Sequence, residues 1–191
     1  MKPPERNRRG PEAGGPGRDI PGPTPLEVLA ARHWRWGWWS LWAFLCLGLG
    51  LEMLHGFKDP GYVAPSQSTR RLMWTLAHAH GTLLALVQLA FAAFLGTVAG
   101  RLGGVAAAGV QAEGRGERGR RWSWASSLLG AAQALLPIGF LLGGWFIRGG
   151  DPGLGVFLVP VGALCLVVSV GLIASASGAA GTPPTRTPTE S

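Results

Sequence analysis

Four long apolar blocks constrain the fold of this chain more than any other feature of its sequence. They cover about residues 36–54, 72–98, 124–146 and 152–174. A helix rises about 1.5 Å per residue, so about 20 apolar residues cross the roughly 30 Å hydrocarbon layer of a bilayer. Only 14% of the 191 residues are charged, and most of them lie outside these blocks. We therefore predict an all-α polytopic membrane protein, a four-transmembrane-helix bundle, rather than a soluble domain.

The two ends of the chain differ in composition from the blocks. Residues 1–33 are basic and rich in Pro, Gly and Arg, and residues 176–191 are rich in small and polar residues. Such segments bury too little apolar surface to offset chain entropy, so we predict disordered tails on either side of a transmembrane domain at 34–175. A cleaved signal peptide is the competing interpretation of the first block. The long preceding tail, Glu52 and the lack of an A-x-A-like site before Gly56 favour a permanent span.

The distribution of Lys and Arg predicts the orientation. Seven precede the first block, five lie between the second and third, and one follows the fourth; the other two connections carry three and one. By the positive-inside rule, both termini and the connection at 99–121 face the cytoplasm. The abundance of Arg, Gly and Ala is typical of a GC-rich bacterial source, so we expect a bacterial cytoplasmic (inner) membrane protein.

Charge and cysteine content narrow the functional classes. The pI is about 11, but the basic residues flank apolar blocks, which indicates contact with the lipid bilayer rather than with nucleic acid. Cys46 and Cys165 each lie inside a block, so we expect two small buried side chains and no disulfide framework. The sequence contains no P-loop, HExxH or paired-carboxylate pattern, and no Ser-His-Asp pattern appears.

Helical periodicity assigns a small or polar face to each block, and such faces pack inward in membranes. In the second block His78 shares a face with Gly81, Thr82, Ala85, Ala92 and Gly96. His80 points about 200° away, so the two histidines cannot serve one site from a regular helix. The corresponding faces of the third and fourth blocks carry Ser126, Gly130, Gln133, Pro137 and Gly144, and then Gly155, Gly162 and Ser169.

Two further positions have structural interpretations. Asp151 precedes Pro152, a pattern typical of an N-cap, and predicts that the fourth helix starts there. His33 lies beside several tryptophans, so we interpret it as a residue of the membrane interface.

Ionisable residues inside membrane spans are costly and frequently functional. Glu52, His55 and His78 all fall toward the outer ends of the first two helices. Carboxylate and neutral imidazole suit a divalent metal, and the same groups relay protons, so these three residues form a candidate metal or proton site. The structural alternative is that Glu52 pairs with Lys58, Arg71 or Arg148, while His78 bonds a neighbouring helix.

The run His78-Ala79-His80-Gly81 resembles the H-x-H segments of haem-copper oxidase and nitric oxide reductase core subunits. That resemblance implies b-type haem as a candidate cofactor, with His78, His80 and His55 as candidate ligands. His55 lies about 9 Å from His78 along the membrane normal, so a dimer would have to supply the second axial ligand.

The chain as a whole is similar to small uncharacterised bacterial membrane proteins with four spans and an H-x-H near the start of the second. The resemblance covers residues 36–174 and implies a topology, with no activity to carry over.

Two function classes follow from these observations. The first is an accessory or structural membrane subunit, not an enzyme, with a homo-oligomer or other membrane subunits as partners. The alternative is a metal-, haem- or proton-handling protein that uses Glu52, His55 and His78. No second charged residue lies deep in the third or fourth block, which disfavours a relay across the whole membrane.

Overall fold

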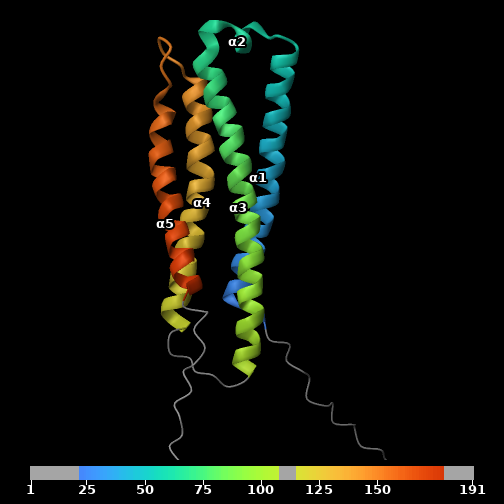
Figure 1. Cartoon of the computed structure of the whole chain (residues 1–191), viewed down its shortest axis with the longest axis vertical. Coiled ribbons are helices and arrows are strands. Elements are labelled where there is room, and N and C mark those ends of the chain that lie inside the picture. The colour runs from blue at the N-terminus through green and yellow to red at the C-terminus, as the bar shows by residue number, and fades with distance from the viewer. Residues whose placement is uncertain (1–21, 108–114, 179–191) are drawn as a thin grey trace, which may run out of the picture.

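A computed structural model describes residues 22–107 and 115–178 as a set of long antiparallel helices (Figure 1). The elements in chain order are α1 (Pro25–Gly56), α2 (Pro60–Val63), the 3-10 turn η1 (Pro65–Gln67), α3 (Ser68–Ala107), α4 (Arg115–Trp145), the 3-10 turn η2 (Leu154–Phe157) and α5 (Leu158–Gly178). Four helical segments are long and apolar enough to cross a membrane, namely 25–56, 65–101, 119–145 and 154–177. The described residues form no β-strand. The all-α, four-span prediction is therefore confirmed.

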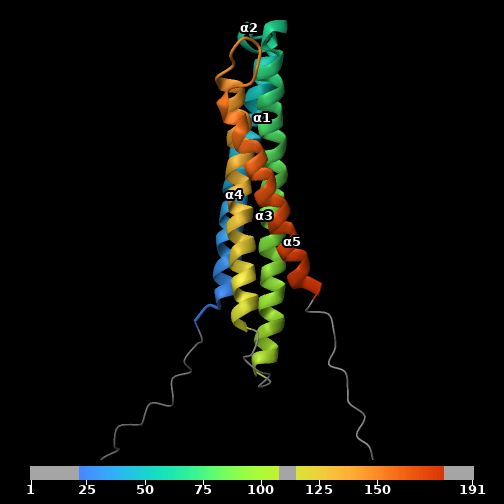
Figure 2. The same ribbon diagram turned by 90° about the vertical axis from the view of Figure 1, so that its left-hand side faces the viewer.

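The four long helices form an open row rather than a closed ring. α3 and α4 lie in the middle, α1 packs on α3, and α5 packs on α4 on the opposite side (Figures 1 and 2). We call the end that carries α2 the α2 end. The end where α1 and α4 begin, at Pro25 and Arg115, is the tail end.

α1 begins earlier than its apolar block. Thr24 Oγ1 accepts the backbone N–H of Glu27 at 3.3 Å, and the Glu27 carboxylate accepts the backbone N–H of Thr24 at 2.6 Å. This capping box fixes the start of the helix at Pro25. The predicted tail boundary at residue 33 is therefore wrong for residues 25–33, whose Leu26 and Leu29 pack on the core at the tail end. Residues 1–21 lie outside the described part of the chain.

The start of the fourth span also differs from the prediction. Asp151 and Arg148 exchange two backbone hydrogen bonds, of 3.0 and 3.1 Å, across a tight turn whose central Gly149 and Gly150 have φ of 59° and 94°. Only glycine adopts two consecutive positive φ values at little cost. Asp151 therefore belongs to this turn instead of capping a helix, and helical structure starts three residues later, at Leu154.

The connection predicted at 99–121 is shorter than expected, because α3 continues to Ala107 and α4 begins at Arg115. Residues 108–114 and the predicted C-terminal tail from 179 onward lie outside the described part.

The small-residue faces are the packed faces, as periodicity predicts. On α5, Gly162 lies so close to α4 that an added Cβ would sit 2.9 Å from the Leu136 nitrogen. Ser169 is fully buried and donates to the Ala125 carbonyl at 2.8 Å. On α3, Ala85 and Ala92 are buried, whereas Gly96 near the tail end is exposed. Close helix approach through small residues thus holds the row together.

Candidate functional site

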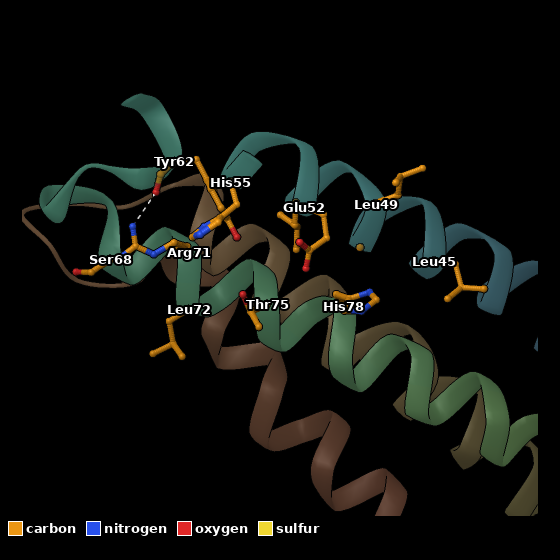
Figure 3. A pocket seen from close by; sticks show the side chains of 12 residues that line it. Leu45, Leu49, Glu52, His55, Tyr62, Ser68, Arg71, Leu72, Thr75 and His78 are labelled. Atoms are coloured by element: carbon orange, nitrogen blue, oxygen red, sulfur yellow. Dashed lines mark hydrogen bonds between the residues drawn. The ribbon is translucent and has the colours of Figure 1, made fainter. Parts of the chain in front are cut away.

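A cavity of about 750 Å³ lies between α1 and α3 at the α2 end (Figure 3). Its polar lining includes all three residues of the predicted outer cluster, Glu52, His55 and His78, together with Arg71 and Thr75. Its apolar lining includes Leu45, Leu49, Leu51 and Leu72. The chain therefore brings the three predicted residues around one space within the size range of small-molecule sites.

His78 projects from α3 toward α1 and is fixed there by a hydrogen bond. Its Nδ1 lies 2.8 Å from the Phe44 carbonyl oxygen. Because a carbonyl only accepts, Nδ1 carries the proton, and in the neutral ring Nε2 is left as an acceptor. Gly48 creates the room for this contact, since an added Cβ would lie 2.7 Å from His78 Nδ1. The sequence thus positions one proton-accepting nitrogen beside the cavity.

Glu52 and His55 follow Gly48 on α1 by one and two helical turns. Glu52 extends from α1 toward α3, and His55 lies beside Arg71 (Figure 3). Arg71 donates to the backbone carbonyls of Tyr62 and Val63 at 3.1 and 2.9 Å, which ties α2 across the mouth of the cavity. The guanidinium therefore holds the α2 segment in place and adds a fixed positive charge at this end.

A metal ion would require the side chains of Glu52, His55 and His78 to lie close enough to bind it together. Within residues 22–107 and 115–178, no group of three or more His, Cys, Asp or Glu side chains is close enough to hold a metal ion. Glu52, His55 and His78 surround the cavity without forming a ligand set.

His80 points away from this cavity, as the helical periodicity predicts. Its Nδ1 lies 2.9 Å from the Leu76 carbonyl of its own helix, and its ring lies 5.0 Å from that of Phe140 on α4. Since His78 faces α1 and His80 faces α4, one iron cannot take both as axial ligands within a single chain.

The most buried histidine is one that the sequence placed at the membrane interface. His33 is only 3% exposed, so that interpretation is wrong. Its Nδ1 bonds the Gln88 side-chain oxygen on α3, and its Nε2 lies 2.6 Å from Ser126 Oγ on α4. Arg32 also donates to Ser126 Oγ, and Gln88 Nε2 donates to the Leu129 carbonyl at 3.3 Å. We call His33, Gln88, Ser126 and Arg32 the tail-end node.

The tail-end node has the order of a serine–histidine–amide relay, but its serine is not a nucleophile. Ser126 is fully buried, and Arg32 donates into its hydroxyl oxygen. A hydroxyl that accepts from a cation is less nucleophilic, and no substrate reaches a fully buried oxygen. The node therefore ties three helices together and presents a buried, titratable ring.

Helical periodicity indicates that His33 faces inward. It lies four residues before Gly37, and Gly37, Phe44 and Gly48 all face α3. His33 therefore belongs to the inward face of α1. The apolar block begins only at residue 36, so apolar length alone does not extend the predicted helix back to His33.

Comparison of this chain with protein-family models, curated proteins and solved structures found no match. A functional assignment therefore rests on the residues of this chain and their geometry.

Proposed function

We propose that this protein is a proton-handling membrane subunit in which Glu52 and His78 take up and release protons in the α1–α3 cavity. The supporting observation is that a carboxylate and an imidazole with a fixed tautomer line the same cavity. The sequence raised two function classes, an accessory subunit and a metal-, haem- or proton-handling protein. The proposal takes the second class and limits it to protons.

The spacing along α1 supports exchange between the two groups. The His78 ring rests on Gly48, and Glu52 follows one turn later, about 6 Å along the helix axis. A proton crosses such a gap through a bridging water molecule. Leu45, Leu49 and Leu51 border the same space.

Metal and haem have less support from the same residues. A metal needs at least three converging ligands, and the described residues provide no such group. The hydrogen bond from His78 Nδ1 to the Phe44 carbonyl leaves Nε2 able to bind a metal. Among the described residues, however, His80 turns back to the Leu76 carbonyl and does not join His78 on the inward face of α3.

Infrared spectroscopy tests the proposal on the full chain in lipid nanodiscs. The carboxyl band of Glu52 is identified by its loss in Glu52→Gln and followed against pH. We expect its midpoint to change in His78→Gln, because the two groups share a cavity, and to stay at the wild-type value in His80→Gln, the matched control that faces α4. An equal midpoint in all three proteins would contradict coupled proton handling.

A partner-binding, accessory role has support of its own. Among the described residues, the backbone of α5 packs on α4 and η2, and α5 exposes large apolar residues such as Leu164 and Val167 on its other side. Lipid covers that face in a monomer, whereas in a larger assembly a second copy or another membrane subunit covers it. Native mass spectrometry from nanodiscs distinguishes a monomer from an assembly. A strictly monomeric protein would contradict the proposal that a second copy covers this face.

We further propose that the α2 end faces outward from a bacterial cytoplasmic membrane and that both termini face the cytoplasm. The distribution of Lys and Arg supports this orientation. A cysteine at Ala64, in a chain without Cys46 and Cys165, should react with an impermeant thiol reagent on intact cells. Protection of position 64 together with labelling of a cysteine at Arg101 would mean the opposite orientation.

A further inference from the structure

We propose that the α1–α3 cavity binds an amphipathic carboxylic acid, with its head group on Arg71 and its alkyl chain along leucines of α1. This inference deepens the proposed function and rests on it, because a weak acid is a ligand that exchanges protons with Glu52 and the histidines of the cavity. The observations that carry it are independent, since they concern the guanidinium group of Arg71 and the apolar side of the cavity.

The guanidinium group of Arg71 is held in a position that suits a carboxylate. Arg71 is half-buried and lines the cavity. Within the described residues it donates two hydrogen bonds, to the Tyr62 and Val63 carbonyls, and both come from Nη1. A guanidinium has five N–H groups, so Nε and Nη2 keep a parallel pair, which matches the two oxygens of one carboxylate. Because the two carbonyls already fix the group, little conformational entropy is lost when a ligand binds.

The depth of Arg71 in the membrane suits a charged head group. His55 lies beside Arg71 (Figure 3), and Trp74 follows Arg71 by about one turn. The Trp74 ring lies 5.8 Å from that of the exposed Trp145 on α4. Tryptophans gather where the hydrocarbon layer meets the polar head groups of the lipid. A carboxylate on Arg71 therefore lies at the membrane interface, where the charged end of an amphiphile is stable.

Exposed leucines extend from this polar end toward the middle of the bundle. Leu49 and Leu45 precede Glu52 by one and two turns on the same face of α1, and they are 64% and 54% exposed. The cavity is therefore open to lipid on its apolar side. From His55 to Leu45 the helix rises about 15 Å, which is half of the roughly 30 Å hydrocarbon layer. The apolar side thus accommodates one alkyl chain within a single leaflet.

The charges in the cavity favour a ligand that enters as a neutral acid. Arg71 and Glu52 are groups of opposite charge, and the other titratable groups in the lining are His55, Tyr62 and His78. A permanent anion would add a net negative charge, which is costly inside a membrane protein. A carboxylic acid adds none, because its O–H bond breaks, the proton binds to Glu52 or to a nitrogen of His55, and the carboxylate pairs with Arg71. No electrons are transferred, and the net charge of the cavity is unchanged.

Carbon NMR of carboxyl-labelled laurate tests the site on the full chain in phosphatidylcholine nanodiscs. We expect a bound carboxyl resonance that empty nanodiscs lack. The bound carboxylate should persist to lower pH than that of laurate dissolved in the lipid, because a guanidinium group favours the charged form. Methyl laurate has the same chain without an acid, so it should compete less well than unlabelled laurate.

Arg71→Gln should lose the bound resonance, and Arg70→Gln should keep it. Arg70 is the matched control because it also donates to backbone carbonyls but lies outside the cavity lining. Thr75→Phe fills the cavity and leaves the bonds of Arg71 intact, so it keeps the test valid if Arg71→Gln does not fold. Thr75 is exposed, and we expect Thr75→Phe to fold and to lose the resonance. Ala79→Phe, at an exposed position one turn away and outside the lining, should bind laurate as the wild type does.

Four results would overturn the acid site. Three are a wild-type spectrum without a bound resonance, equal resonances in the wild type, Arg71→Gln and Thr75→Phe, and equal competition by methyl laurate and laurate. The fourth is stronger competition by phosphatidylglycerol than by laurate, which would assign the cavity to a lipid head group. If laurate does not bind but the Glu52 infrared midpoint still changes in His78→Gln, the proposed function stands without this ligand. If laurate binds while that midpoint stays constant, the cavity binds the acid and the proposed proton handling fails.

Discussion

The inward face of α1 has different surroundings in the two halves of the helix. Toward the tail end, Gly37 lets α3 approach closely, and His33 is enclosed by Gln88 and Ser126. Toward the α2 end, beyond Gly48, the helix stands between two cavities, of about 750 and 610 Å³, that share Leu51 in their linings. His33 in the first half is paired at both ring nitrogens within the protein, while Glu52 and His55 in the second half line open space.

The difference shows how a membrane helix can combine anchorage and chemistry. Buried polar groups that satisfy each other are strong interhelical contacts, since no water competes for them. Polar groups at a cavity remain free to bind protons or a ligand. We therefore expect substitutions in the tail-end half to change stability and substitutions near the cavity to change titration.

The largest expected effect on stability is that of His33→Leu. It leaves the Gln88 oxygen and the Ser126 hydroxyl without their histidine partner, and each unpaired buried group costs about 1–3 kcal/mol. The free energy of unfolding, measured by steric trapping in bicelles, should fall by about 3 kcal/mol. His55→Leu is the control, because His55 is exposed at the cavity. Equal losses of unfolding free energy in His33→Leu and His55→Leu would contradict the proposal that the tail-end half of α1 contributes more to stability than the cavity half.

Gly48→Ala should have the next largest effect. The added methyl group overlaps the His78 ring, and overpacking of this kind costs about 1–3 kcal/mol. Gly50→Ala is the matched control two residues away, where an added Cβ meets no atom within 4 Å. If the ring instead swings into the cavity, stability is retained but the nitrogen NMR signals of His78 change, because the bond to the Phe44 carbonyl is lost.

The fold was predictable because its strongest signals are long and local. Apolar length predicts the four spans, and the spacing of Gly162 and Ser169 predicts the packed face of α5. Glu52, His55 and His78 could be placed together because the first two spans are joined at the α2 end, so their adjacent halves must meet there. The prediction of an N-cap at Asp151 is wrong because two patterns meet there. Asp-Pro is typical of a helix start, whereas the preceding Gly-Gly forms a turn, and the turn determines the local backbone.

The tail-end node was missed because its members lie far apart in sequence and on three helices. Gln88 and Ser126 are ordinary polar residues in apolar blocks, and only the packing of α1 on α3 and α4 brings His33 between them. One local signal for the start of α1 was present, namely Thr24 followed three residues later by Glu27. Extending the helix to that capping box would have placed His33 on the same face as Gly48.

Thr24→Ala should have a smaller effect and sharpens the boundary of the tail-end half. It removes the hydroxyl acceptor of the capping box, which is worth about 1 kcal/mol at a typical N-cap. Hydrogen exchange of the first turn of α1 should accelerate, while exchange near Gly48 stays unchanged. Acceleration along the whole helix would mean that the cap supports the cavity half as well.

Glu52→Gln should have the smallest effect on stability and the clearest effect on function. Glu52 is exposed and lines the cavity, and the amide is nearly isosteric with the carboxyl group, so we expect a change within about 0.5 kcal/mol. The pH-dependent carboxyl band in the infrared spectrum should disappear, because Glu52 supplies the carboxyl group of the cavity. A Glu52→Gln protein that unfolds readily would mean that the carboxylate holds α1 in place. The cavity half would then be anchored by charge, as the tail-end half is by His33.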